Sequence, residues 1–196
     1  MSVLVKICGI TRIEDALAAV SAGADALGFN FWPRSPRFLT PEQAREILPM
    51  VPAGILRVAV LVDETIAPVE GIDVLQIHGA LHRAPQGRWW RALSAGAGIR
   101  ETMRESPGAE AFLVDTPAGE ARGGTGRTFD WRLAAGIEAK VILAGGLGPD
   151  NIEAALEAAR PWGVDACSRL ESAPGVKDAA RMEAFVRAVR TWEERA

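Results

Sequence analysis

The sequence contains no tyrosine, only two cysteines and two histidines, and no apolar run of the roughly 18 residues that a membrane span requires. A membrane protein is therefore not expected. Two cysteines do not form a disulfide framework, and the opening residues MSVLVK are not a secretory signal, because no basic segment precedes a long apolar one. The sequence predicts a cytoplasmic protein.

The net charge is −3 at pH 7, and acidic and basic residues are interspersed along the chain. A protein that binds nucleic acid or an anionic membrane surface carries a basic patch, so neither partner is expected. The two cysteines lack metal-ligand spacing, which argues against a thiol-based metal or redox protein. No linker or low-complexity tract divides the 196 residues, so residues 1–196 are expected to form one domain.

Short apolar segments alternate with helical patterns throughout the chain. Continuous apolar runs of this length are typical of parallel strands that helices cover. Strands are expected at residues 3–7, 26–29, 56–61, 74–77, 89–93, 111–114, 140–143 and 163–166. Helices are expected at residues 13–21, from Thr40-Pro41 onward, 152–159 and 179–194.

Eight such units predict an α/β fold, a closed (β/α)8 TIM barrel, rather than an open sheet, since right-handed crossovers place every helix outside. Two connections are short, with eleven residues at 63–73 and nine at 80–88. A complete crossover needs at least about 10–12 residues. We therefore expect shortened crossovers after the third and fourth strands, with one or both of their helices reduced to a single turn or an irregular loop.

The first strand ends by delivering Cys8 into the turn formed by residues 9–12. The loops that follow strands gather at one face of α/β folds and build their active sites there. Cys8 is therefore a candidate nucleophile or base. The alternative is that it is a small buried hydrophobe, because free cysteine is among the most buried residue types.

Asp115 ends the sixth predicted strand in the same way and is the second candidate, although a lone aspartate at this position also commonly caps a turn. Residues 118–131 then contain four glycines, which allow close backbone approach or closure over a ligand, and Thr128 and Phe129 lead into the next expected helix.

Gly145 and Gly146 follow the seventh predicted strand. Loops after strands seven and eight commonly hold a phosphate through backbone N–H groups and a helix amino terminus. A glycine pair can also be only a turn. Its position in this chain favours a phosphate site.

Taken together, these segments resemble the phosphoribosylanthranilate isomerase family of tryptophan biosynthesis, in the family's order and over most of the chain. The matching segments are KICGITR (6–12), GADALGFNFWPRSPRF (23–38), LQIHG (75–79), LVDT (113–116), GGTGRTFDW (123–131), LAGGLGPDN (143–151) and SAPGVKD (172–178).

The resemblance implies a (β/α)8 barrel and the Amadori rearrangement of N-(5-phosphoribosyl)anthranilate to the 1-deoxyribulose 5-phosphate, with no cofactor and no metal. It also implies that Cys8 is the general base and Asp115 the general acid. The pKa of Cys8, about 8.5 in a free thiol, must then lie near or below neutrality, and that of Asp115, about 3.9 unperturbed, must be raised.

By the same resemblance, Arg37 binds the anthranilate carboxylate, which a planar guanidinium can hold bidentately. Trp32 in the same loop can border the anthranilate ring, whereas Arg34 is expected to be a surface arginine. His78 ends the fourth strand and Asp165 lies near the end of the eighth. Both are expected to support the site, although His78 can equally be a structural, hydrogen-bonded histidine.

The segment 166–171 departs from the family, which reads closer to Val-Ser-Ser-Gly-Val-Glu. Ser168 is retained beside the expected phosphate, and Arg169 replaces a glycine there. Arg169 either adds a cationic contact or blocks backbone approach, and we expect the contact because the ligand is anionic. Cys167 replaces a serine, so oxidants could couple it to Cys8 if the two Cα atoms lie within about 7 Å.

The residues are also compatible with alternative functions. Related phosphate-binding barrels that isomerise sugars or synthesise indoleglycerol phosphate need paired aspartates or a lysine, and Cys8 argues against them. A non-catalytic phosphate-binding barrel would not need Cys8 and Asp115 together. The partner is expected to be a small phosphorylated substrate, and a monomer or a homodimer is feasible.

Overall fold

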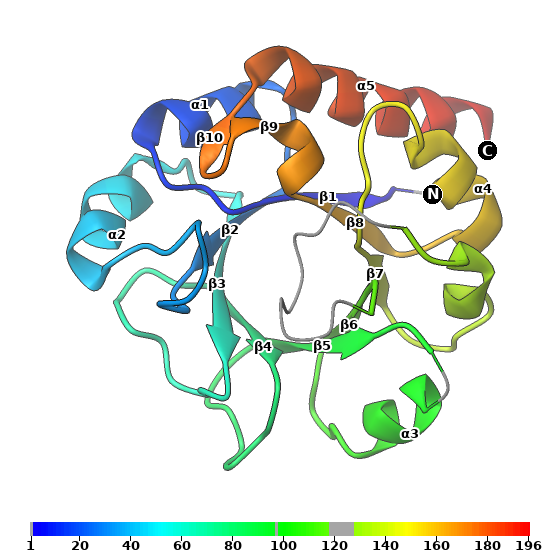
Figure 1. Cartoon of the computed structure of the whole chain (residues 1–196), viewed down its shortest axis with the longest axis horizontal. Helices are drawn as coiled ribbons and strands as arrows, with labels where there is room; N and C mark the ends of the chain where they lie inside the picture. Colours follow the sequence, from blue (N-terminus) through cyan, green and yellow to red (C-terminus); the bar gives the residue numbers. More distant parts are fainter. Residues whose placement is uncertain (1, 97, 118–127) are drawn as a thin grey trace.

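The computed structural model describes residues 2–96, 98–117 and 128–196. Eight parallel strands pair in sequence order and close into a barrel (Figure 1). The predicted (β/α)8 fold is confirmed. The strands are β1 (Leu4–Cys8), β2 (Ala26–Asn30), β3 (Leu56–Val62), β4 (Val74–His78), β5 (Trp89–Ser94), β6 (Ala111–Asp115), β7 (Val141–Leu143) and β8 (Gly163–Ala166).

The alternation of side chains along each strand decides which residues face the barrel interior. On β1, Val5 and Ile7 are buried in the large cluster that includes the surrounding helices. Leu4 instead packs with an interior cluster that includes Val58, Trp90 and Leu113. Lys6 and Cys8 share the face of Leu4, so the sequence spacing sends both of them into the barrel.

In the part of the chain that the structure describes, five α-helices pack outside the strands (Figure 1). They are α1 (Ile13–Ser21), α2 (Pro41–Ile47), α3 (Ile99–Arg104), α4 (Ile152–Ala159) and α5 (Ala179–Arg195). Thr40 and Gln43 form a capping box at the start of α2, which confirms the predicted start. Met182, Phe185 and Val189 of α5 are buried, and their spacing of three and four residues places them on one face of the helix.

The two shortened crossovers are also confirmed, since the fully described segments between β3 and β5 contain loops rather than helices (Figure 1). The outer face of these strands, which includes Leu61, Leu75 and Trp89, is nevertheless buried. Arg91 of β5 donates to the carbonyl oxygens of Ile77 and Gly79. A long side chain thus satisfies part of the backbone that lacks a covering helix.

Three parts of the chain differ from the expectation. The helix expected after Thr128 and Phe129 is a 3-10 turn, η3 (Trp131–Ala134), which Asp130 caps. After β8, the 3-10 turn η4 (Ser168–Leu170) leads into a hairpin of β9 (Glu171–Ala173) and β10 (Val176–Lys177) that the apolar pattern did not predict. A further 3-10 turn, η1 (Leu48–Met50), follows α2. Most of the glycine-rich segment, residues 118–127, lies outside the described residues.

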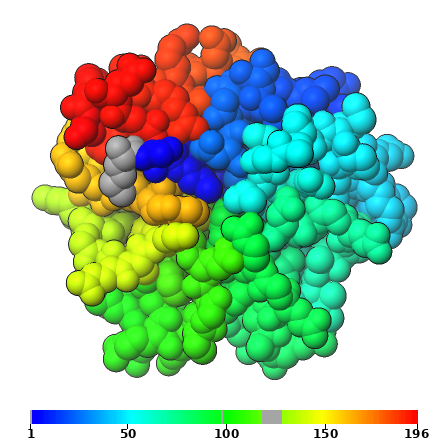
Figure 2. Space-filling model, turned by 180° about the vertical axis from the view of Figure 1, so that it is seen from behind, coloured from blue at the N-terminus to red at the C-terminus, as the bar shows by residue number. Residues whose placement is uncertain are grey.

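The two ends of the barrel differ. The loops that follow the strands face the viewer in Figure 1, whereas packed atoms of the described residues cover the centre when the molecule is seen from behind in Figure 2. The chain termini meet at one side, where the backbone N–H of Val3 donates to Glu193 of α5. Within the described ranges, none of the helices has the length and apolar character to cross a membrane.

Candidate active site

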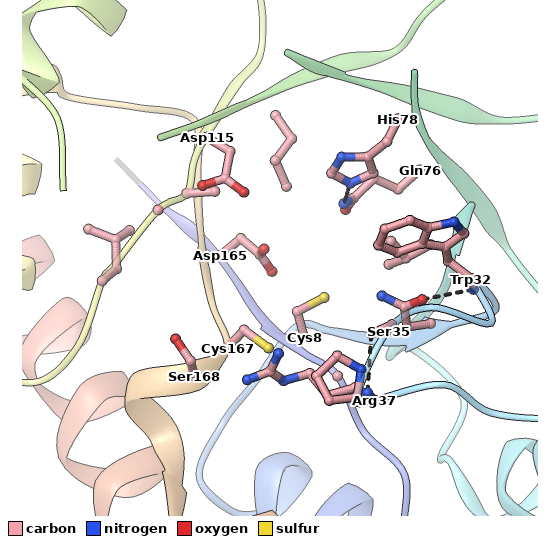
Figure 3. Close-up of a pocket in the computed structure, with 18 of the residues that line it drawn as sticks. Cys8, Trp32, Ser35, Arg37, Gln76, His78, Asp115, Asp165, Cys167 and Ser168 are labelled. Carbon is pink, nitrogen blue, oxygen red and sulfur yellow. Dashed lines mark hydrogen bonds between the residues drawn. The ribbon is translucent and has the colours of Figure 1, made fainter. Parts of the chain in front are cut away.

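A cavity of about 560 Å³ opens at the carboxyl ends of the strands (Figure 3). It brings together eight of the nine residues that the sequence singled out, although they are spread from position 8 to position 168. The eight are Cys8, Arg37, His78, Asp115, Gly145, Gly146, Asp165 and Ser168. The cavity is therefore the site to which the sequence reasoning pointed.

Cys8 ends β1, and its side chain points into the cavity (Figure 3). The residue is 8% exposed, so it is a nearly buried thiol on a cavity wall rather than a core hydrophobe. Gly28 lies beside it on β2, and a Cβ atom there would come within 2.7 Å of the Cys8 sulfur. The glycine therefore provides the space that the sulfur occupies.

The surroundings of Cys8 favour its thiolate. The neighbouring Cys167 side chain, together with the charges of Lys6 and Lys177, lowers the pKa of Cys8 to about 7. Burial and the charge of Asp165 act in the opposite direction without cancelling this shift. A useful fraction of Cys8 is thus ready to accept a proton near neutral pH.

Asp115 ends β6 and faces the same cavity from the other side of Asp165 (Figure 3). Burial raises the pKa of Asp115 to about 6, and the negative charge of Asp165 adds to this effect. The backbone N–H of Thr116, 2.7 Å from the carboxylate, and the charge of Lys6 limit the rise. The carboxyl group can therefore hold a proton at a pH where an exposed aspartate cannot.

A buried ion pair links the two candidate groups. Lys6 Nζ lies 2.7 Å from Asp165 Oδ1, and the Lys6 side chain is fully buried. Lys6 lowers the pKa of Cys8, and Asp165 raises the pKa of Asp115. The Lys6–Asp165 ion pair therefore contributes to the lowered pKa of the thiol and to the raised pKa of the carboxyl group. The sequence reasoning named Asp165 but missed Lys6. Its position two residues before Cys8 on a strand was the available signal.

Arg37 is held by Glu171. Its Nε and Nη2 atoms donate to the two carboxylate oxygens at 2.9 and 2.7 Å. These hydrogen bonds raise the pKa of Arg37, and Arg37 together with Lys177 keeps the pKa of Glu171 below its usual value despite burial. Two of the five guanidinium N–H groups are used in this way, so an edge of the group is fixed while it lines the cavity. Sequence reasoning missed the role of Glu171.

His78 and Gln76 face the cavity from β4 (Figure 3). Their side chains are hydrogen-bonded, with 2.9 Å between Gln76 Nε2 and His78 Nε2. His78 is therefore hydrogen-bonded, as expected for a structural histidine, and it also lines the cavity, as expected for a residue that supports the site. The Oε1 atom of Gln76, although buried, finds no hydrogen-bond partner among the described residues.

The loop after β2 forms another wall. Trp32 lines the cavity, and the Arg34 guanidinium lies 5.3 Å from the centre of its ring. Arg34 is exposed, as expected for a surface arginine, but it also lines the cavity rim.

Gly145 and Gly146 have φ angles of +85° and +64°, a backbone conformation that favours glycine. A Cβ atom at Gly145 would lie 2.2 Å from the Thr116 hydroxyl, so any other residue there would clash with the end of β6. Asn151 secures the loop, because its side chain accepts from the Gly148 N–H and donates to the Gly146 carbonyl, both at 2.9 Å. The backbone of Gly145 and Gly146 therefore forms the cavity wall here, with no side chain between it and the cavity.

Arg169 is the one predicted site residue that does not line the cavity. Its Nη2 atom lies 2.6 Å from Asp150, and Nη1 donates to the Gly146 carbonyl at 3.3 Å. It therefore supports the glycine loop from behind. A direct contact between Arg169 and a phosphate stays a prediction.

The two cysteines are neighbours with free thiols. Ile7 pairs with Ala166, so Cys8 and Cys167 follow a paired position on adjacent strands. Adjacent strands lie about 4.7–4.9 Å apart, within the range of about 4.4–6.8 Å that disulfides span. Across the described ranges, no group of three or more His, Cys, Asp or Glu side chains is placed to hold a metal ion.

We predict that diamide, which takes two hydrogens from a pair of thiols, couples Cys8 to Cys167. Intact-mass measurement should show the loss of two hydrogens and of both alkylatable thiols, with reversal by dithiothreitol. The Cys167→Ser variant is the control. It has one cysteine, so it cannot form a disulfide within the chain, and that thiol should stay alkylatable. If wild-type protein retains both thiols under these conditions, the prediction is wrong.

The fold and the cavity define the chain as a (β/α)8-barrel enzyme whose site lies at the carboxyl-terminal mouth. The family model for N-(5'-phosphoribosyl)anthranilate (PRA) isomerase matches residues 5–188. The chain belongs to this family, the isomerases of tryptophan biosynthesis.

Individual relatives agree with the family match. An N-(5'-phosphoribosyl)anthranilate isomerase of Solibacter usitatus is 48% identical over 200 residues, covering 95% of this chain and 97% of the relative. The structure of phosphoribosyl anthranilate isomerase from Thermotoga maritima is 32% identical, with a TM-score of 0.86, and covers 97% of this chain and 100% of that one. A phosphoribosyl anthranilate isomerase in complex with reduced 1-(o-carboxyphenylamino)-1-deoxyribulose 5-phosphate is 31% identical, with a TM-score of 0.79 and the same coverage.

Proposed function

We propose that this chain catalyses the Amadori rearrangement of N-(5-phosphoribosyl)anthranilate with Cys8 as the general base and Asp115 as the general acid. The observation that carries the assignment is the pairing of opposite pKa shifts on facing walls of one cavity. The pKa of the thiol is lowered to about 7 and that of the carboxyl is raised to about 6. Groups that titrate near the working pH are the most effective proton-transfer catalysts.

The chemistry divides into two proton transfers. Protonation of the furanose ring oxygen by Asp115 opens the ring and leaves an iminium ion. Cys8 then removes the proton from the sugar C2, which gives an enolamine that tautomerises to the ketone. The anthranilate nitrogen accepts the electrons released at C2, so one acid and one base on the protein suffice.

The walls of the cavity suit the two anionic ends of this substrate. The ligand of the related complex carries a carboxyphenyl group and a 5-phosphate. In this chain, Arg37, fixed by Glu171, is assigned to the carboxylate, and the backbone of Gly145 and Gly146 with Ser168 is assigned to the phosphate.

The direct test is the loss of anthranilate fluorescence when purified protein is added to the substrate. Because the substrate and the product are isomers of equal mass, the product must be identified as the deoxyribulose phosphate by its separate elution in chromatography. Turnover of substrate supports the proposal. A folded protein that binds the substrate without converting it would favour the alternative of a non-catalytic phosphate-binding barrel.

We also infer that the whole chain acts as one domain, because β8 closes the barrel against β1 and α5 packs over β1. The cytoplasmic location stays a prediction, and so does the oligomeric state, monomer or homodimer.

The dependence of kcat/KM on pH is expected to be bell-shaped, with limbs near pH 6 and pH 7. The productive form needs Asp115 protonated and Cys8 deprotonated. Because the acid has the lower pKa, this form amounts to only about one molecule in twenty at the maximum. Initial rates measured from pH 5 to 9 at low substrate concentration would test the profile, and a plateau without limbs would contradict it.

Asp165→Asn is the matched variant for this profile. It removes the negative charge that raises the pKa of Asp115 and leaves Lys6 to act more strongly on Cys8. Both limbs should therefore move to lower pH. Movement of either limb to higher pH would mean that the Lys6–Asp165 pair does not shift the pKa values of Cys8 and Asp115 in this way.

A further inference from the structure

Lys177 is a buried cation that the proton transfers leave unexplained. Its side chain is fully buried on β10 and does not line the cavity. Its Nζ atom donates to Glu171 Oε1 at 2.9 Å, to the Cys167 carbonyl at 3.2 Å and to the Cys167 sulfur at 3.8 Å. It therefore holds both the backbone and the thiol of Cys167.

The charges gathered around Cys8 are unequal. Three cations and two carboxylates surround the thiol, which leaves one positive charge in excess. The cations are Lys6, Arg37 and Lys177, and the carboxylates are Asp165 and Glu171. Asp115, His78 and the guanidinium of Arg34 line the rest of the cavity. A thiolate at Cys8 offsets the local excess of positive charge around its own sulfur.

Cys167 is the contact between Lys177 and Cys8. It follows the position on β8 that pairs with Ile7, and its sulfur lies 2.9 Å from where a Cβ atom of Gly9 would be. Figure 3 shows the two sulfurs facing the same cavity. Since Lys177 donates to the Cys167 sulfur, the S–H of Cys167 is left for an acceptor, which is either Glu171 Oε1 at 3.9 Å or the Cys8 sulfur.

We propose that Cys167 is a positioning residue whose S–H, set in place by Lys177, donates to the Cys8 sulfur and keeps it as an unprotonated acceptor facing the substrate. Glu171 Oε1 already accepts hydrogen bonds from Arg37 and Lys177, so a further hydrogen bond from the thiol would stabilise its charge little. The same S–H stabilises a thiolate at Cys8 more. The importance of this contact for turnover rests on the proposed role of Cys8, but the contact itself can be tested without turnover.

The test compares Cys167→Ser with Cys167→Ala. The chain has two cysteines, so each variant keeps Cys8 as its single thiol. The rate of carbamidomethylation by iodoacetamide is measured from pH 5 to 10 without substrate, and its midpoint reports the thiolate. Serine keeps a hydrogen-bond donor and alanine removes it, while both side chains are small enough for the barrel to retain its fold, which circular dichroism would check.

The midpoint should stay near pH 7 in Cys167→Ser and rise by about one pH unit or more in Cys167→Ala. Adding Lys177→Gln to Cys167→Ser should also raise it. Equal midpoints in the serine and alanine variants would overturn the proposal, whether or not the lysine variant folds. If the midpoint shifts but the pH dependence of turnover does not follow it, the contact stands and the role of Cys8 as base fails.

Discussion

Cys8→Ala is expected to lower kcat by about 10²- to 10⁴-fold, the range that positioned acid–base groups contribute. The side chain lines the cavity at the end of β1, so its loss removes the proposed base while the barrel core is left intact. KM should change little, because the groups assigned to the carboxylate and the phosphate are elsewhere. Steady-state fluorescence assays would measure both constants.

Cys8→Ser is the matched control for this prediction. It keeps the size and direction of the side chain but replaces the thiol with a hydroxyl, which does not ionise near neutral pH. It should be nearly as inactive as the alanine variant, with the same thermal unfolding midpoint as the wild type. Activity within tenfold of the wild type in either variant would exclude Cys8 as the base.

Asp115→Asn is expected to cause a loss of similar size, about 10²- to 10⁴-fold in kcat. The amide keeps the shape of the carboxyl and can still accept the hydrogen bond from the Thr116 N–H, which is 2.7 Å long in the structure. The amide N–H is too weak an acid to protonate the ring oxygen. The loss should therefore arise from chemistry rather than from a rearranged loop.

The pH profile distinguishes this variant from a damaged one. In Asp115→Asn the fall in rate at alkaline pH should disappear, because no carboxyl group is left to lose its proton. The rate should instead rise with pH through about 7, the pKa of Cys8, and then level off. Circular dichroism and alkylation of Cys8 would show that the site is otherwise intact. An Asp115→Asn protein that keeps both limbs would mean that another group supplies the proton.

Local sequence patterns were sufficient for most of the fold. Each barrel strand was found within one residue of its bounds, because buried parallel strands are continuous apolar runs between turn residues. The hairpin of β9 and β10 was missed because its strands, Glu171–Ala173 and Val176–Lys177, are short and carry buried charged residues. Its position depends on contacts with distant parts of the chain, such as the bond between the Lys177 N–H and Asp15.

The sequence by itself determined the barrel and placed Cys8 and Asp115 at its mouth, because strand periodicity and strand ends decide which side chains reach that face. The resemblance of its motifs gave the family, which is confirmed, and the acid and base roles, which stay a proposal. The sequence did not determine the charge state of Cys8 and Asp115. Lys6 meets Asp165, and Lys177 meets Cys167, across 159 and 10 residues of chain respectively. Only barrel closure and burial bring such charges within a few ångströms at low dielectric, where they move the pKa values of Cys8 and Asp115 in opposite directions.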